Sequence, residues 1–168
     1  MRLETRWDAD RIAERVIQVA TALDRAPERD NLVLVSVLKG GSFFLADLAR
    51  RLSKPAACEF ISVRRGGNEI LQIDFSTPFT VQGRPVLLLK DVVHSGVIET
   101  YLAEKLREGG ASSVRVAAII DKPQDRRTPV AVEHALFSAA TGVFAGYGME
   151  FLGLHGQRPD IVEVVEEQ

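Results

Sequence analysis

Cysteine is nearly absent from this sequence of 168 residues, which has one cysteine, one tryptophan and three histidines. A single cysteine excludes an internal disulfide and any metal site built from several thiolates. That residue, Cys58, lies in the apolar segment ACEFISV, where we expect a small core side chain rather than a reactive thiol. His94, His134 and His155 lie far apart and lack the spacing of zinc ligands, so the sequence does not indicate a histidine metal site.

Long apolar runs and a strong charge imbalance are also missing. No apolar run approaches the length of a membrane-spanning helix, and the opening residues MRLETRWDAD lack the apolar core of a signal peptide. The formal net charge is only −2, so the composition does not indicate a basic surface for nucleic acid. We therefore expect a cytoplasmic protein that binds neither membranes nor nucleic acid.

Apolar segments with the spacing of a helix alternate along the chain with continuous apolar runs typical of buried strands. Helical spacing predicts a first helix over residues 7–25, with Asp8 or Asp10 as its N-cap. Apolar strand-like segments occupy residues 31–38, 57–63, 85–91 and 113–121, and helical patterns follow two of them, over residues 39–52 and 97–110. This alternation predicts one α/β domain over residues 1–168, with a mostly parallel sheet flanked by helices.

The predicted inward positions follow from the same spacing. In the two N-terminal helices, the apolar side chains expected to face the core are Ile12, Val16, Ile17, Ala20, Leu23, Phe43, Phe44, Leu45, Leu48 and Leu52. Trp7 is predicted to be a packing anchor that holds the first helix in place.

Three loops follow predicted parallel strands, at the edge of the sheet where such folds bind ligands. The first is Lys39-Gly40-Gly41, whose glycines allow a close backbone approach to an anion. The second runs from Lys90 to Gly96 and leads into a helix N-terminus, which favours a phosphate. The third is Asp121-Lys122-Pro123, in which Lys122 either donates to a ligand carbonyl or forms a surface ion pair.

The order and spacing of these loops resemble the type I phosphoribosyltransferase family, closest to its hypoxanthine-guanine members, over essentially the full length. LVLVSVLKGGSFFLADLARRL resembles the family's first strand, pyrophosphate loop and helix, and VLLLKDVVHSGVIETYLAEKL resembles its diphosphosugar-binding strand, loop and helix. VAAIIDKP and VFAGYGMEF take the places of its purine-contacting segments. The resemblance implies the type I fold with a small hood built from the termini, and a homodimer. It also implies the substrates phosphoribosyl pyrophosphate and a purine base, with Mg²⁺ as cofactor.

The resemblance also implies two phosphate sites. Lys39 and Gly40 would hold pyrophosphate, with a non-proline cis peptide bond before Lys39. The turn Ser95-Gly96-Val97 would hold the 5′-phosphate.

The family's purine, metal and catalytic positions match a second set of residues. Lys122 would read the six-position oxygen of the purine, beside Val143 and Phe144. Glu150 would help to bind the metal, and Asp91 matches the second acid of the catalytic pair.

Several family positions are altered in this chain. Lys90 replaces a glutamate, and His94 replaces the aspartate that handles the purine proton, a task a histidine performs near neutral pH. Ile98 replaces a phosphate-binding threonine, and Gly156 replaces an arginine, with Arg158 nearby.

These alterations leave two functions open. In the first, the chain is an active purine phosphoribosyltransferase with His94 as acid or base. In the second, it is a relative with impaired catalysis that binds a purine nucleotide or regulates another process. Lys90 is predicted to pair with Glu150 or Asp91, placing its ammonium where the metal would lie.

Overall fold

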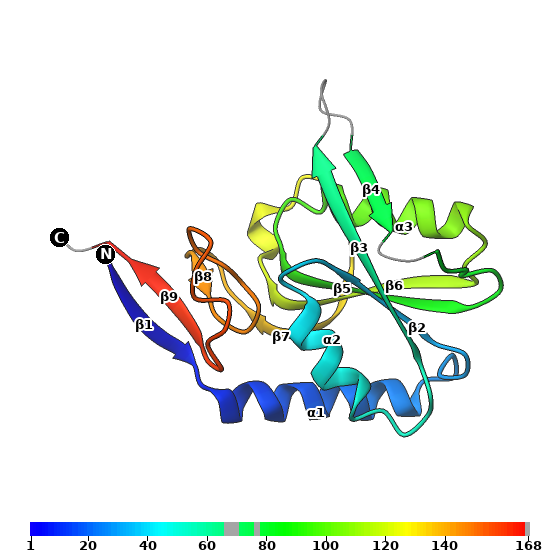
Figure 1. The fold of residues 1–168 in the computed structure, drawn as a ribbon, viewed down its shortest axis with the longest axis horizontal. Coiled ribbons are helices and arrows are strands. Elements are labelled where there is room, and N and C mark those ends of the chain that lie inside the picture. Colours follow the sequence, from blue (N-terminus) through cyan, green and yellow to red (C-terminus); the bar gives the residue numbers. More distant parts are fainter. Residues whose placement is uncertain (66–70, 76–77, 167–168) are drawn as a thin grey trace.

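The computed structural model describes residues 1–65, 71–75 and 78–166, and its centre is a six-stranded sheet in the order β4-β3-β2-β5-β6-β7 (Figure 1). The strands are β2 (Val33–Val37), β3 (Ala57–Arg65), β4 (Leu71–Phe75), β5 (Pro85–Val93), β6 (Ser113–Asp121) and β7 (Val132–Ser138). Every neighbouring pair is parallel except β3 with β4, so the predicted mostly parallel sheet is confirmed.

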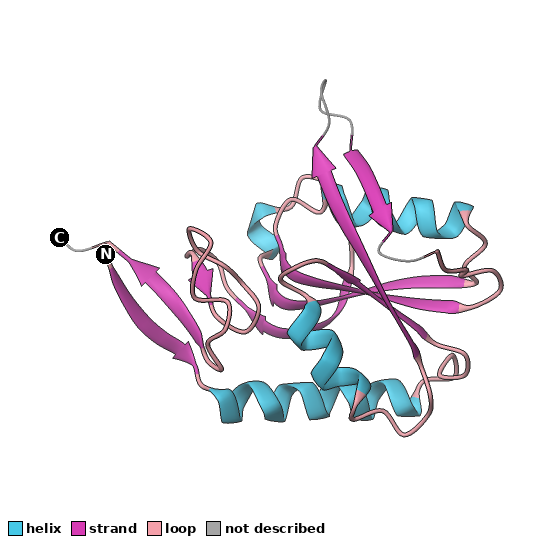
Figure 2. Cartoon of the chain, in the orientation of Figure 1, coloured by secondary structure: helices cyan, strands magenta, loops and turns pink. Residues whose placement is uncertain are grey.

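Helices cover both faces of this sheet, α1 (Ala9–Arg25) and α2 (Ser42–Ala49) on one side and α3 (Val97–Glu108) on the other (Figure 2). Successive side chains of a strand point to opposite faces. Leu87 and Leu89 of β5 therefore pack with α1 and α2, whereas Val86 and Leu88 pack with α3. The strands consequently read as continuous apolar runs, because both faces are buried.

The first helix begins as its sequence indicates. Asp8 is the N-cap, and its side chain accepts a hydrogen bond of 2.8 Å from the amide of Arg11. Trp7, just before the cap, stacks on Phe137 of β7 with ring centroids 4.3 Å apart and also contacts Phe144. Trp7 is therefore the predicted packing anchor.

A second, three-stranded sheet forms a hood beside the central sheet, with the order β1-β9-β8. Its strands are β1 (Arg2–Trp7), β8 (Phe144–Ala145) and β9 (Ile161–Val165), so both ends of the chain contribute to it, as predicted (Figure 1). Within residues 142–149, only the two residues of β8 form a strand. The rest of that segment forms tight turns, including isolated bridges from Gly146 to Met149 and from Phe151 to Leu154.

Three predicted core positions are wrong. Ile17 is 51% exposed and Phe43 is 44% exposed, because each lies just beyond the edge of its helix's buried stripe. Cys58 is also exposed, and partial burial of its thiol, with the neighbouring Glu59, raises the pKa of the side chain. Near its start, β3 is not covered on both faces, so an apolar sequence does not guarantee burial there.

Across the described ranges, none of the helices combines the length and the apolar character needed to cross a bilayer.

Candidate active site

The first site loop joins β2 to α2 and places Lys39 and Gly40 above the sheet edge. The Leu38–Lys39 peptide bond is cis, as the family resemblance implied. A Cβ at Gly40 would lie 2.1 Å from Oδ2 of Asp91, so only glycine allows this approach between two loops. Within the described ranges, the amides of Lys39 and Gly40 have no hydrogen-bond acceptor, which leaves both available to an anion.

The second loop joins β5 to α3 and ends in a helix N-terminus. Gly96 has a left-handed backbone (φ 79°), and a Cβ there would lie 2.6 Å from Cγ1 of Val130. Glycine is thus required both by conformation and by packing. Val97 begins α3, so the amides of Val97 and Ile98 stand at the positive end of the helix dipole. This construction is typical of phosphate sites, and residues 95–97 are called the phosphate turn below.

The third loop follows β6 and carries a buried lysine. Lys122 is 6% exposed, and its Nζ donates to the carbonyl oxygen of Gly142 at 2.5 Å. The same Nζ lies 5.5 Å from the ring centroid of Phe144. Lys122 is therefore not a surface ion pair. It joins the sheet edge to the hood segment that carries Val143.

Hood residues Val143 and Phe144 lie beside Lys122 but differ in exposure. Val143 is 53% exposed, whereas Phe144 is 8% exposed and packs on Trp7. Val143 therefore offers the larger free apolar surface at this edge.

Arg126 ties the second and third loops together. Its Nη1 donates to the carbonyl oxygens of Val93 at 3.0 Å and His94 at 2.5 Å, and its Nη2 pairs with Asp121. The amide of Arg127 adds a hydrogen bond of 2.8 Å to the carbonyl oxygen of Ser95. These contacts hold the backbone of the phosphate turn in place.

The side chain of His94 extends toward solvent from the backbone that Arg126 holds in place. Its side chain is 55% exposed, and Nδ1 lies 3.5 Å from Oδ2 of Asp125. A carboxylate near Nδ1 orients an imidazole and leaves Nε2 free for proton transfer. The two side chains line one cavity with Ser95, Gln124 and Arg126.

Both acidic residues predicted for the site are paired with lysines. The Nζ of Lys90 donates to Oδ1 of Asp91 at 2.6 Å, and this lysine side chain is only 14% exposed. The predicted pairing with Asp91 is therefore confirmed. Glu150 pairs instead with Lys39, whose Nζ lies 2.9 and 3.0 Å from the two carboxylate oxygens.

Gly156 and Arg158 lie in the hood segment that follows Glu150 in the sequence. A Cβ at Gly156 would lie 3.2 Å from Cγ of Glu150, so the hood turn packs closely at this position. Arg158 makes a two-pronged ion pair with Asp160, at 2.9 and 3.0 Å, and this pairing holds the pKa of the Asp160 carboxyl below its usual range. The guanidinium is thus held within the hood.

Comparison with known proteins agrees with this arrangement. The model of the phosphoribosyl transferase domain matches residues 8–151. The chain belongs to this family.

Named relatives and solved structures support the same assignment. The chain is 28% identical over 165 residues to hypoxanthine-guanine phosphoribosyltransferase from Dictyostelium discoideum, covering 93% of this chain and 92% of the relative. It is 27% identical over 157 residues to the bifunctional protein TilS/HprT of Listeria innocua, covering 90% of this chain and 24% of the relative. A crystal structure of hypoxanthine-guanine phosphoribosyltransferase from Bacillus anthracis superposes with a TM-score of 0.91 at 24% identity, over 96% of this chain and 98% of that one. At that identity, the superposition shows the phosphoribosyltransferase fold.

Asp125 and Arg126 are the site residues of this phosphoribosyltransferase domain that the sequence reasoning missed. The signal was present, because the charged run DKPQDRR directly follows a buried parallel strand. Its side chains had to lie beside the loop that follows the neighbouring strand.

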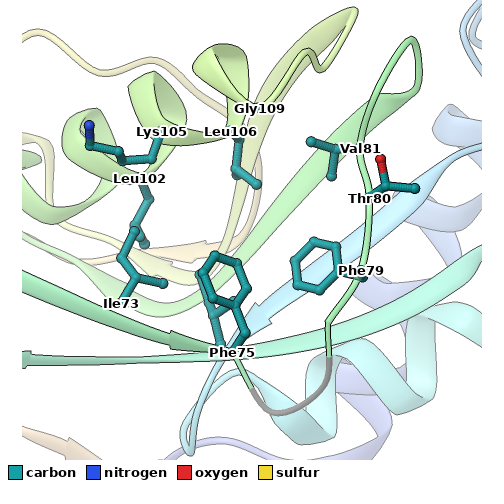
Figure 3. Close-up of a pocket in the computed structure, with 10 residues that line it drawn as sticks. Ile73, Phe75, Phe79, Thr80, Val81, Leu102, Lys105, Leu106 and Gly109 are labelled. Atoms are coloured by element: carbon teal, nitrogen blue, oxygen red, sulfur yellow. The ribbon is translucent and has the colours of Figure 1, made fainter.

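A separate apolar pocket of about 160 Å³ lies on the α3 side of the sheet, between β4, residues 79–81 and α3 (Figure 3). Phe75 and Phe79, which both line it, meet edge to face with ring centroids 5.4 Å apart. Leu102 and Leu106 form its inner wall (Figure 3). Neither the phosphate turn nor Lys122 lines it, so the candidate active site lies elsewhere.

Proposed function

We propose that this chain is a purine phosphoribosyltransferase, which transfers the phosphoribosyl group of phosphoribosyl pyrophosphate to hypoxanthine or guanine. The observation that carries the proposal is the meeting of three parts at one sheet edge: the loop at Gly40, the helix N-terminus at Gly96 and the buried Lys122. The name of the relative in Dictyostelium supports this substrate class.

The phosphate groups of the substrate match backbone amides in the first two loops. Lys39 and Gly40 bind the pyrophosphate, because no acceptor among the described residues takes their amides and the charged side chain of Lys39 is 75% exposed. Ser95, Gly96 and Val97 bind the 5′-phosphate at the N-terminus of α3. Ile98 supplies an amide to the same turn but no hydroxyl group.

The purine lies between Lys122 and Val143. Lys122 donates to the six-position oxygen of the base when its hydrogen bond to Gly142 is exchanged or shared. The exposed side chain of Val143 contacts the purine ring, and the ring of Phe144 packs against the ammonium of Lys122. A lysine donor discriminates against bases that carry an amino group at this position, since that group is itself a donor.

The reaction exchanges one bond at C1′ of the ribose for another. The bond from C1′ to purine N9 forms, and the bond from C1′ to the pyrophosphate oxygen breaks, so the electron pair leaves with pyrophosphate. The proton released by the base passes to Nε2 of His94, while Asp125 stabilises the imidazolium that results. Asp91 orients the loop at Gly40 through close contact with it.

Magnesium is the cofactor that the family resemblance implies. Asp91 and Glu150, the acids available for it, already accept hydrogen bonds from Lys90 and Lys39. No group of three or more histidine, cysteine, aspartate or glutamate side chains suited to a metal occurs in the described part of the chain. These side chains do not fit a divalent ion held by the protein, and the reaction above uses neither acid as a metal ligand.

A single-turnover assay tests the proposal. Excess protein is mixed with labelled guanine or hypoxanthine, phosphoribosyl pyrophosphate and magnesium, and nucleotide product is counted over hours. Product that disappears in His94→Ala supports an enzyme with a histidine base. Nucleotide binding without product supports the second candidate, a nucleotide-binding relative, which is favoured by the two lysine–carboxylate pairs.

We further propose a homodimer that works in the cytoplasm, where its charged phosphate-ester substrates are held. Leu38, Phe43 and Leu154 are 38%, 44% and 64% exposed and line a common cavity beside Lys39. Apolar side chains gathered on one surface are typical of a protein interface. Burial of this cluster in a dimer would also cover the outer side of the pyrophosphate loop.

A further inference from the structure

The charge beside Gly40 is already balanced by this chain's own lysines. Asp91 directs Oδ2 toward Gly40, while its Oδ1 accepts hydrogen bonds from Nζ of Lys90 at 2.6 Å and from the amide of Val92 at 2.8 Å. Oδ2 thus faces the loop at Gly40, whereas Lys90 balances the charge of the carboxylate at Oδ1.

Lys90 is held much more firmly than a surface lysine. It lies near the end of β5, where its backbone pairs with Ala118 of β6, and its side chain is 14% exposed. Charges that are mostly excluded from water are weakly screened by salt and by solvent. The ammonium of Lys90 therefore contributes a fixed positive charge at the sheet edge.

Lys39, which lies in the same loop as Gly40, is a contrasting case. Its side chain is 75% exposed, so its ion pair with Glu150 is of the weak, solvent-screened kind. A diphosphate can compete for this lysine. The loop that contains Lys39 also packs against the hood, because a Cβ at Gly148 would lie 2.5 Å from the carbonyl oxygen of Gly40.

We propose that Lys90 takes the place of a protein-bound divalent cation, and that the chain binds the diphosphate of its ligand without magnesium. A bare Asp91 carboxylate beside Gly40 would repel a diphosphate. Neutralising it is a task that a metal ion can perform, and here the ammonium of Lys90 performs it. The inference rests on the proposed function, since it concerns the same pyrophosphate loop.

Isothermal titration with inorganic pyrophosphate and with phosphoribosyl pyrophosphate tests this inference, once with a chelator and once with magnesium. For each ligand and the unaltered chain, the dissociation constant measured with the chelator is expected to agree within about threefold with the one measured with magnesium. In Lys90→Met, affinity in the chelator is expected to fall roughly 10- to 100-fold and to recover with magnesium, because Asp91 is left uncompensated. The matched control is Lys54→Met, which removes a lysine paired with Asp30, and no change is expected there.

Two further variants separate charge from structure. Lys90→Arg keeps the charge and is expected to keep binding in the chelator. The double variant Lys90→Met/Asp91→Asn removes both charges and is expected to lose the magnesium dependence that Lys90→Met acquires. If Lys90→Met does not fold, judged by thermal unfolding, the unaltered chain and Lys90→Arg still decide the question.

The outcomes are distinguishable. Binding by the unaltered chain only when magnesium is present would overturn the role of Lys90 and leave the proposed function intact. An unchanged affinity of folded Lys90→Met in the chelator would overturn it too. Binding of neither ligand under either condition would overturn the proposed function itself.

Discussion

Lys122 and Gly142, which lie 20 residues apart in the sequence, are joined by a hydrogen bond of 2.5 Å from Nζ to the carbonyl oxygen. The contact links the end of β6 to the hood, and it holds a buried ammonium at the edge where the purine is proposed to bind. A buried charge with one backbone partner has donors to spare. This is the position from which a ligand carbonyl would be read.

Replacement of Lys122 by methionine is expected to lower kcat/KM for the purine base roughly 10- to 100-fold, the effect of losing a hydrogen bond from a charged donor. Steady-state kinetics with hypoxanthine measure this loss. Lys105→Met is the control, because Lys105 is exposed and pairs with Glu108 on α3. Equal kinetics for Lys122→Met and the unaltered chain would remove Lys122 from the purine site.

Replacement of His94 by alanine is expected to slow the chemical step by about 10² to 10⁴, the usual contribution of a positioned acid or base. Nucleotide affinity is expected to stay nearly constant, because the side chain of His94 is 55% exposed and its loss leaves no buried cavity. Single-turnover rates and nucleotide titration separate the two quantities. Asp125→Asn is expected to give a smaller loss of the same kind, and an unaltered rate in His94→Ala would assign the proton to another group.

Replacement of Gly40 by alanine is expected to abolish pyrophosphate binding while the fold is retained. The new Cβ would lie 2.1 Å from Oδ2 of Asp91, so the loop or the aspartate must move. Calorimetric titration with pyrophosphate measures the loss. Gly109→Ala is the matched control, since the nearest atom to a Cβ there is at an ordinary 3.4 Å. Normal binding by Gly40→Ala would mean that this close approach is unimportant.

Replacement of Trp7 by alanine is expected to lower the free energy of unfolding by about 3 kcal/mol, as is usual for large aromatic deletions. The ring stacks on Phe137 and contacts Phe144, so its loss loosens the junction of hood and core. Urea denaturation measures the change. Phe75→Ala, which removes a ring that is 55% exposed, should cost much less; an equal cost would contradict the anchoring role of Trp7.

Burial lowers the pKa of His134 from its usual 6.5, and the nearby charge of Arg115 acts in the same direction against that of Glu133. The unfolded chain therefore binds more protons at this residue between the two pKa values. The free energy of unfolding should decrease as the pH falls below 6.5 toward the lower, folded-state pKa. His134→Gln is expected to show a shallower decrease, measured by urea denaturation at several pH values. The same pH dependence in both proteins would assign the effect elsewhere.

Much of the fold could be predicted from local patterns. Asp8 followed by helical spacing located the start of α1, and continuous apolar runs located β2, β5 and β6, because strands buried on both faces carry no alternation. Ile17 and Phe43 were misplaced, since the width of a helix's buried stripe depends on what packs against it.

The candidate site was predicted less completely. Lys39, Gly40 and Gly96 lie in short loops directly after buried strands, so their position at the ligand-binding edge of the sheet could be inferred from the sequence. The partner of Lys90 was predicted as Glu150 or Asp91 and is Asp91, but the partner of Glu150 could not be inferred. Glu150 was matched to a metal and accepts from Lys39, because a long flexible side chain reaches whichever opposite charge the fold brings near.

The sequence by itself determined the order of strands and helices and the three loops at the carboxyl edge of the sheet, since these depend on periodicity and on residues with special backbone freedom. Only the tertiary structure decided that Lys39 meets Glu150, that Lys122 meets Gly142 and that Arg126 holds the phosphate turn. Such contacts join segments far apart in the chain. Their distances are set by the packing of whole elements, which no local pattern encodes.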